Sequence, residues 1–161
     1  MSDIFTKAKR SEVMSRIRSR GNKDTELALA KLFRRHKITG WRRHAQIVAA
    51  VYNRRPSSGA HRAPLQPRQF SVRPDFVFPK LKLTLFVDGC FWHGCPKHET
   101  KPKSNRAFWR RKFSGNKKRD VLVTRTLRRA GWRVLRVWEH ELAKKNEARL
   151  MLRIKRALIW G

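Results

Sequence analysis

The sequence predicts a single α/β domain in which a mixed central sheet is flanked by helices. Its 161 residues suit one domain with its own core. A mostly apolar run at residues 83–87, rich in aromatic and β-branched side chains, is typical of a buried strand. A helical pattern at 117–130 separates this run from a second strand pattern at 132–138. That order indicates a βαβ crossover, so the second strand is expected to run parallel to a neighbour.

The charge of the chain predicts a polyanionic partner. There are 41 Lys and Arg residues against 11 Asp and Glu, which gives a formal net charge of +30. Hydrophobic residues still make up 40% of the chain, so we expect a folded protein rather than a basic tail. Binding to nucleic acid releases condensed counterions and offsets the self-repulsion. A structural RNA-binding protein of ribosomal type also fits this charge.

The sequence shows neither a signal peptide nor a membrane-spanning segment. The first residues are polar and charged, unlike a signal peptide, and no apolar run approaches about 18 residues. The two cysteines are five positions apart and next to histidines, which favours metal ligation over a disulfide. We therefore expect a cytoplasmic protein, and a monomer.

Residues 1–23 form a basic arm ahead of the domain at 24–161. Within the arm, Met14 and Ile17 are three residues apart and would share one face of a helix. They either pack against the domain or act as apolar probes in a DNA groove.

The first helix of the domain is expected at residues 25–36. Asp24 can cap it, and Leu29, Leu32 and Phe33 form its apolar stripe. Glu26 lies in the first turn, where a carboxylate complements the helix dipole. Strand-like content follows at 41–52, and a Pro-, Ser- and Gly-containing stretch at 53–69 predicts a flexible inserted loop.

Two predicted strands each carry a carboxylate at one end. Asp75 begins the pattern at 74–78, and Asp88 ends the apolar run. Carboxylates supplied by adjacent strands suit a divalent metal. Further along, a short helix is expected at 105–113 and a firmer one at 117–130, with Val121, Leu122 and Leu127 on its apolar side. Gly131 would cap it, and a last helix is expected at 142–160.

A second metal site is predicted in the loop after the central strand. Cys90, Cys95 and His98 follow the spacing C-x4-C-x2-H, which can bring three ligands around one tetrahedral Zn²⁺. The fourth ligand must come from elsewhere. His140, at the end of another strand, is the first candidate and His93 is the competitor. Four such ligands leave no open position, so this zinc would be structural.

The motifs around these residues resemble one known family. Pro74-Asp75, twelve residues and Asp88-Gly89-Cys90 follow the outline of the PD-(D/E)xK nucleases, with Cys90 where that pattern has Lys. RPDFV, VDGCFWH and GWRVL with VWE then occur in order. From about Ala8 to about Leu142 the chain is similar to the very-short-patch-repair (Vsr) mismatch endonucleases.

The resemblance implies a restriction-endonuclease-like core and Mg²⁺-dependent nicking of DNA beside a T·G mismatch, the product of 5-methylcytosine deamination. Asp75 matches the family's Mg²⁺-binding aspartate and His93 its catalytic histidine. Asp88 falls where the family has a histidine or an aspartate in the catalytic site. Glu26 and Asp120 match acidic positions near the hydration shell of the metal.

The resemblance also implies DNA-binding and zinc-binding residues. Phe91, Trp92 and Trp109 match aromatic side chains that wedge into the base stack, and Lys112 and Asn116 are expected to contact DNA. The family's zinc ligands correspond to Cys90 and Cys95, with His140 where a fourth ligand lies. From the residues alone, the alternative is that Phe91 and Trp92 fill the core beneath the zinc.

The sequence therefore supports two functions from different classes. The first is a zinc-containing, Mg²⁺-dependent nicking endonuclease with mismatched double-stranded DNA, and possibly other mismatch-repair proteins, as partners. The second is a DNA-binding protein that keeps the fold and the zinc but has little or no cleavage activity.

Overall fold

The computed structural model describes residues 12, 25–51, 68–98, 102 and 105–159. Nearly all of the predicted arm, including Met14 and Ile17, and most of the predicted loop at 53–69 lie outside these residues. The chain divides into two units. The first unit comprises Met1–Thr39, Val87–Lys117 and Arg136–Gly161, and the second comprises Gly40–Phe86 and Lys118–Leu135. No described helix combines the length and the apolar character that crossing a bilayer requires.

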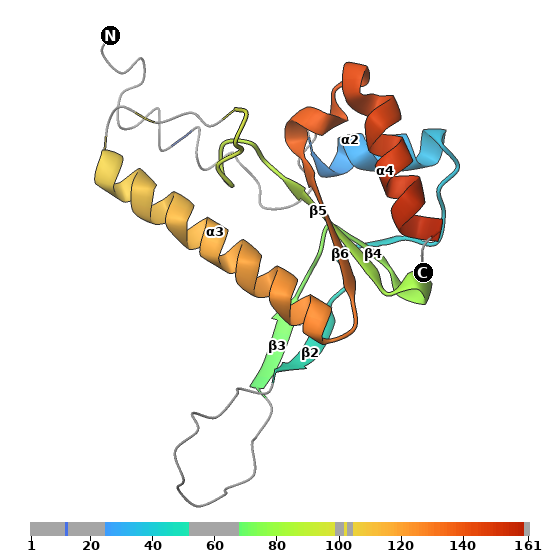
Figure 1. Ribbon diagram of the computed structural model, residues 1–161, viewed down its shortest axis with the longest axis horizontal. Coiled ribbons are helices and arrows are strands. Elements are labelled where there is room, and N and C mark those ends of the chain that lie inside the picture. The colour runs from blue at the N-terminus through green and yellow to red at the C-terminus, as the bar shows by residue number, and fades with distance from the viewer. Residues whose placement is uncertain (1–11, 13–24, 52–67, 99–101, 103–104, 160–161) are drawn as a thin grey trace, which may run out of the picture. The chain divides into compact units, whose positions relative to one another are not determined.

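A four-stranded sheet starts in the second unit, and two of its strands continue into the first. Its order is β1-β4-β5-β6. Figure 1 labels three of these strands, β4, β5 and β6. The strands are β1 (Arg42–Arg43), β4 (Phe76–Phe78), β5 (Leu83–Asp88) and β6 (Arg133–Trp138). β4 is antiparallel to both β1 and β5, with Phe76 opposite Leu85. All three residues of β4 are buried, as its apolar sequence predicts.

The predicted crossover is present between β5 and β6. The Arg133 N–H donates to the Lys82 carbonyl at 2.7 Å, and the Thr84 hydroxyl donates to the Arg133 carbonyl at 3.1 Å. Further along, Arg136 of β6 bonds Asp88 of β5. Because the partner numbers rise together, the two strands are parallel. The sheet is therefore mixed, as the sequence predicted.

The second unit also contains a hairpin that the sequence did not reveal. β2 (Ile47–Val51) pairs antiparallel with β3 (Arg68–Val72). The predicted loop was placed at 53–69, so its last two residues belong to a strand. Prolines just before Arg68 hid this strand, because Pro lowers strand propensity for its neighbours. Ile47, Val77 and Leu127 form part of the apolar cluster in this unit.

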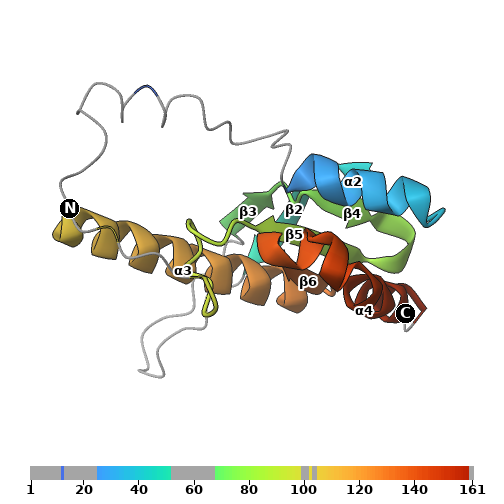
Figure 2. The same ribbon diagram turned by 90° about the horizontal axis from the view of Figure 1, so that it is seen from above.

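The helix between β5 and β6 is continuous. α3 (Arg106–Arg129) replaces the two separate helices that the sequence predicted (Figure 2). Gly115 lies in its middle and costs the helix only about 1 kcal/mol relative to Ala. The predicted apolar side was partly wrong: Val121 and Leu122 are 57% and 53% exposed, whereas Val123, Thr126 and Leu127 are buried. Gly131 ends the helix with φ of +79°, as predicted.

The first unit contains the two remaining long helices. α2 (Glu26–Arg35) confirms the predicted first helix, with Leu29, Leu32 and Phe33 buried. After β6, the short 3₁₀ segments η2 (Glu139–Leu142) and η3 (Lys144–Asn146) precede α4 (Glu147–Ile159). The last helix therefore begins five residues later than predicted. Arg35 and His36 of α2 both pair with Glu147 of α4 at 2.8 Å.

Candidate active site and metal centre

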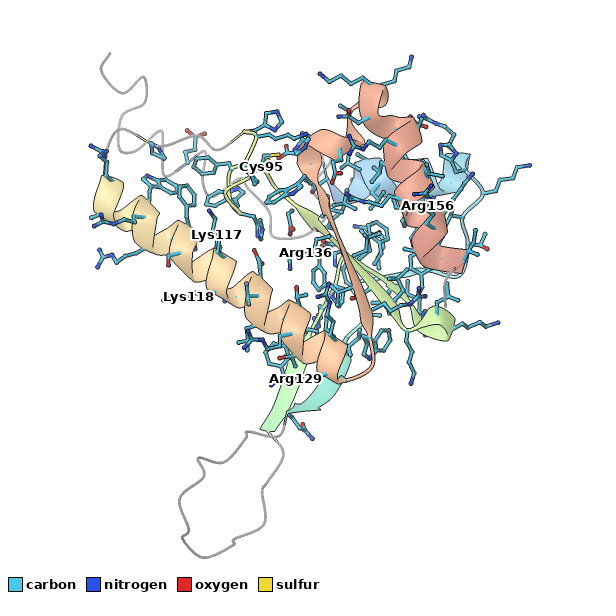
Figure 3. All side chains as sticks on the ribbon, in the orientation of Figure 1. Cys95, Lys117, Lys118, Arg129, Arg136 and Arg156 are labelled. Carbon is cyan, nitrogen blue, oxygen red and sulfur yellow. The ribbon has the colours of Figure 1, made fainter. Side chains whose placement is uncertain are left out.

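Asp88 is a buried carboxylate at the end of β5. Its side chain is 6% exposed, and both of its oxygens accept hydrogen bonds from one guanidinium. Arg136 Nε lies 2.6 Å from Oδ2, and Nη2 lies 2.5 Å from Oδ1. Arg136 is on β6, and Figure 3 labels it on that strand. This fork compensates the charge that burial of Asp88 would otherwise leave unpaired.

His93 lies in the turn that follows β5. Its backbone N–H donates to the Gly89 carbonyl at 3.1 Å, which closes the turn. Its Nδ1 is 3.8 Å from Asp88 Oδ1, and its side chain is 27% exposed. A histidine with one nitrogen toward a carboxylate and partial access to solvent can exchange protons with a water molecule.

Two cysteines and two histidines come together beside this turn. The ligand atoms of Cys90, Cys95, His98 and His140 all lie within 4.8 Å of one another. Cys90 Sγ and Cys95 Sγ are 3.3 and 3.5 Å from His140 Nδ1, and Cys95 Sγ is 3.7 Å from His98 Nδ1. His93, the competing candidate, is not a member of this group.

These distances fit the edges of a zinc tetrahedron. With Zn–S near 2.3 Å and Zn–N near 2.0–2.1 Å, sulfur and nitrogen ligands are about 3.5 Å apart. Both cysteines are free thiols. Burial, and then the neighbouring Cys95, raise the pKa of the Cys90 thiol to about 11. Burial, and then the charge of His98, lower the pKa of His140, which favours the neutral imidazole that a metal requires.

Residues after β6 support the Cys/His cluster. Glu139 Oε2 accepts the Cys90 N–H at 3.0 Å, and Asn146 Nδ2 donates to the His140 carbonyl at 2.8 Å. Cys95 and His140 also line a cavity of about 210 Å³, together with residues of η2, η3 and the first turn of α4. The cluster is thus built from one loop and the end of one parallel strand.

Aromatic side chains gather on the loop after β5 and the first turns of α3. Phe91 makes edge contacts with Trp92, Trp109 and Phe113, at centroid distances of 5.1, 5.2 and 5.4 Å. Phe91 and Trp92 are half-buried, so they neither belong to a fully buried core nor extend freely into solvent. Asn116 donates to the Trp92 carbonyl at 2.7 Å, and Lys112 is exposed.

The other predicted acids are divided between the units. Glu26 is buried in the first turn of α2 in the first unit, whereas Asp75 and Asp120 belong to the second. Beside Asp75 in that unit is His44, with one ligand atom of each within 4.8 Å of the other. A shared metal between Asp75 and Asp88 therefore stays a prediction.

Sequence reasoning missed Arg136, His44 and Phe113. Arg136 could have been noticed as a cation inside the apolar pattern of β6, two positions before the strand ends. His44 precedes β2 and has a φ of +51°. No local sequence pattern predicts this conformation. Phe113 is one turn beyond Trp109 on α3 and shares its face.

Comparison with known proteins identifies the family. The model of the DNA mismatch endonuclease Vsr family matches residues 60–101, the part that contains Asp75, Asp88 and both cysteines. The type II nicking enzyme V.NmeAIP of Neisseria meningitidis serogroup A is 35% identical over 158 residues, which covers 97% of this chain and 94% of that enzyme. The chain belongs to the Vsr family.

Two further Vsr relatives match over shorter segments. The type II nicking enzyme V.NaeI of Lentzea aerocolonigenes is 53% identical over 70 residues, 44% of this chain and 42% of that enzyme. The DNA mismatch endonuclease Vsr of Escherichia coli K12 is 41% identical over 84 residues, 52% of this chain and 54% of that protein. As a Vsr protein, the chain is a DNA endonuclease, a hydrolase, with a mixed α/β core.

Proposed function

We propose that this Vsr protein nicks one strand of duplex DNA beside a T·G mismatch, in a Mg²⁺-dependent hydrolysis that starts very short patch repair. The observation that carries the proposal is the meeting of Asp88 and His93 at the end of β5, at 3.8 Å. A carboxylate and a histidine at a strand end are the groups that phosphodiester hydrolysis needs to bind metal-bound water and move a proton.

His93 is the proposed general base. Its Nδ1 faces Asp88, and its Nε2 is the nitrogen proposed to accept the proton of an attacking water. An imidazole accepts a proton near neutral pH, which suits this step. Asp88 keeps the ring oriented and balances the charge that the ring acquires.

Asp75 is the proposed direct ligand of Mg²⁺, and Asp88 the ligand that acts through a water. The pairing rests on the places of the two acids in the sequence of strands: Asp75 immediately precedes β4, and Asp88 ends β5, the antiparallel neighbour of β4. Arg136 uses one lone pair of each Asp88 oxygen and His93 Nδ1 faces Oδ1, which leaves the second lone pair of Oδ2 for water. When bound, Mg²⁺ would neutralise charge at the leaving oxygen. Glu26 and Asp120 are proposed to bind its hydration shell.

The aromatic cluster is the proposed sensor of the mismatch. Phe91, Trp92 and Trp109 pack edge to face and remain half-buried, so they can present ring faces to unstacked bases. Wedging costs a few kcal/mol of unstacking and costs less at a mismatch, which separates mismatched from paired DNA. Lys112 and Asn116 are proposed DNA contacts nearby, and Met14 and Ile17 are proposed probes in the arm.

The Cys/His cluster is proposed to hold a structural Zn²⁺ through Cys90, Cys95, His98 and His140. All four positions of a tetrahedron are then filled by protein. The zinc would fix the turn that bears His93, whose backbone N–H donates to the carbonyl of Gly89, the residue between β5 and Cys90. This role is separate from hydrolysis.

A nicking assay on a T·G duplex tests the proposal. We expect Mg²⁺-dependent nicking, no nicking after Asp75→Ala, and DNA affinity of that variant within about tenfold because basic residues elsewhere supply the phosphate contacts. Nicking by Asp75→Ala would show that the metal site is wrong. Binding without any nicking by the unmodified chain would favour the DNA-binding protein that lacks cleavage.

A further inference from the structure

A buried, bidentate side-chain pair in the first unit joins Asp88 to Arg136, a residue to which neither motif nor family match assigns a role. Asp88 is 6% exposed and Arg136 is 24% exposed on the side chain. The guanidinium approaches the carboxylate side-on through Nε and Nη2, with one hydrogen bond to each oxygen. Two parallel bonds fix the plane of the carboxylate, whose terminal torsion is otherwise broad.

The fork determines which atom faces His93. Nη2 holds Oδ1, and this same oxygen lies 3.8 Å from His93 Nδ1. A rotation of the carboxylate about its terminal bond would place Oδ2 opposite His93 Nδ1 in place of Oδ1, or would move both oxygens away from it. Catalytic hydrogen bonds are often long before substrate binds and tighten in the complex, so the separation suits a pair that closes on DNA.

The backbone of Arg136 is fixed as well. Arg153 Nη2 donates to the Arg136 carbonyl at 3.1 Å, while its guanidinium also binds Glu141 at 2.8 and 3.0 Å. Arg136 lies on β6, and β6 is paired beside β5 in the sheet. The guanidinium is therefore presented to Asp88 from a rigid element, which is what positioning a catalytic group requires.

We propose that Arg136 is a positioning residue for hydrolysis: its bidentate contact orients Asp88 so that Oδ1 faces His93 Nδ1 and can accept its hydrogen bond. The inference rests on the proposed function, because it assigns His93 as the base. Arg136 touches neither water nor phosphate in this scheme and acts through Asp88. Its geometry, rather than its charge alone, is the property that matters.

Arg136→Lys separates geometry from charge. Lysine keeps the positive charge beside the buried carboxylate but cannot form the fork. We expect kcat for nicking to fall about 10- to 100-fold, because small misplacements of catalytic groups cost this much. KM for the mismatched duplex should stay within about twofold of the unmodified value. Arg35→Lys is the matched control, since Arg35 also holds a carboxylate through two contacts, at 3.0 and 2.8 Å, and does so at Glu147.

A second readout does not depend on activity. The ¹⁵N shifts of the His93 ring, measured above the pH at which it becomes neutral, report which nitrogen carries the proton. We expect the Nδ1–H form in the unmodified protein and in Arg35→Lys, and a mixture of both forms in Arg136→Lys. An unchanged tautomer together with unchanged kcat in Arg136→Lys would overturn the proposal, and so would a change in KM alone.

A double-variant cycle tests whether Arg136 acts through Asp88. In Asp88→Asn, the further change Arg136→Lys should lower kcat by less than threefold, because the carboxylate that it orients is already gone. Equal effects in both backgrounds would contradict the proposal. Asp75→Ala distinguishes failure of the proposed function from failure of this inference. Nicking by that variant would refute the proposed metal site, whereas the tautomer of His93 tests the role of Arg136 independently.

Discussion

Two groups of side chains follow the same strand, and their chemistry differs. The Cys/His cluster offers sulfur and nitrogen ligands from one loop and the end of β6, within 4.8 Å of one another. The Asp88–His93 pair offers a carboxylate and an imidazole, and Arg136 already holds the carboxylate. Thiolates and imidazoles select zinc, whereas carboxylates and water select magnesium. The comparison shows that one short stretch presents two ligand sets of different chemistry, to which we assign a structural and a hydrolytic role.

Removal of the zinc ligands should have the largest effect. Cys95→Ser leaves three ligands and a buried hydroxyl, and apparent binding free energies of structural zinc are on the order of 10 kcal/mol. That is comparable to the whole stability of a domain, about 5–15 kcal/mol. We expect loss of bound zinc and of a cooperative thermal transition, measured by metal analysis and calorimetry. Asp88→Asn is the control and should retain zinc; a stable, zinc-free Cys95→Ser protein would contradict this account.

Substitution of His93 should affect the Asp88–His93 pair and leave the Cys/His cluster intact. His93→Gln keeps a side chain of similar size but removes the base, so nicking should fall about 10²- to 10⁴-fold. Zinc content and Tm should remain those of the unmodified protein, since His93 is outside the Cys/His group. Loss of zinc in this variant would mean that His93, not His98 or His140, completes the tetrahedron.

Lower pH should weaken the binding of zinc to the Cys/His cluster, because protons compete for the two thiols. Burial raises the pKa of Cys90 to about 11 in the metal-free protein, so binding of zinc at neutral pH must displace this proton. Zinc affinity should therefore rise about tenfold or more per pH unit between pH 6 and 8. Competition with a chromophoric chelator at several pH values measures it. An affinity independent of pH would show that the thiols are not ligands.

Glu147 provides a reference outside both groups. A hydrogen bond from His36, and then hydrogen bonds from Arg35, lower the pKa of Glu147 below its ordinary value of 4.5. Because the folded pKa is depressed, its contribution is present above the unfolded pKa and is lost as the pH falls through the folded pKa. Glu147→Gln should lower Tm slightly at pH 7 and less at pH 3. Neither zinc content nor nicking should change; altered nicking would show that this pair affects the active site.

The sequence predicted the features that local pattern determines. The apolar run of β5, the strand β6 and the buried face of α2 were predicted because continuous or periodic burial leaves a signature. The grouping of Cys90, Cys95 and His98 also follows from spacing. The βαβ order correctly predicted that β6 is parallel to a neighbouring strand, and His140, the candidate placed after that strand, belongs to the Cys/His cluster.

Features that depend on tertiary packing were not predictable. Val121 and Leu122 are apolar yet exposed, because the phase of α3 is set by Val123 and Leu127. The hairpin strand β3 is specified by its pairing with β2, not by its own sequence RQFSV. The role of Arg136 could not be predicted either, because its hydrogen bonds to Asp88 depend on the pairing of β6 with β5.

A structure of the protein with a T·G duplex and Mg²⁺ tests the central claim most directly. We predict a hydrated metal ion that joins Asp75 and Asp88, His93 Nε2 within hydrogen-bond reach of a metal-bound water, and zinc among Cys90, Cys95, His98 and His140. The account is contradicted if Asp75 and Asp88 point to opposite faces of the sheet, or if His93 binds the zinc.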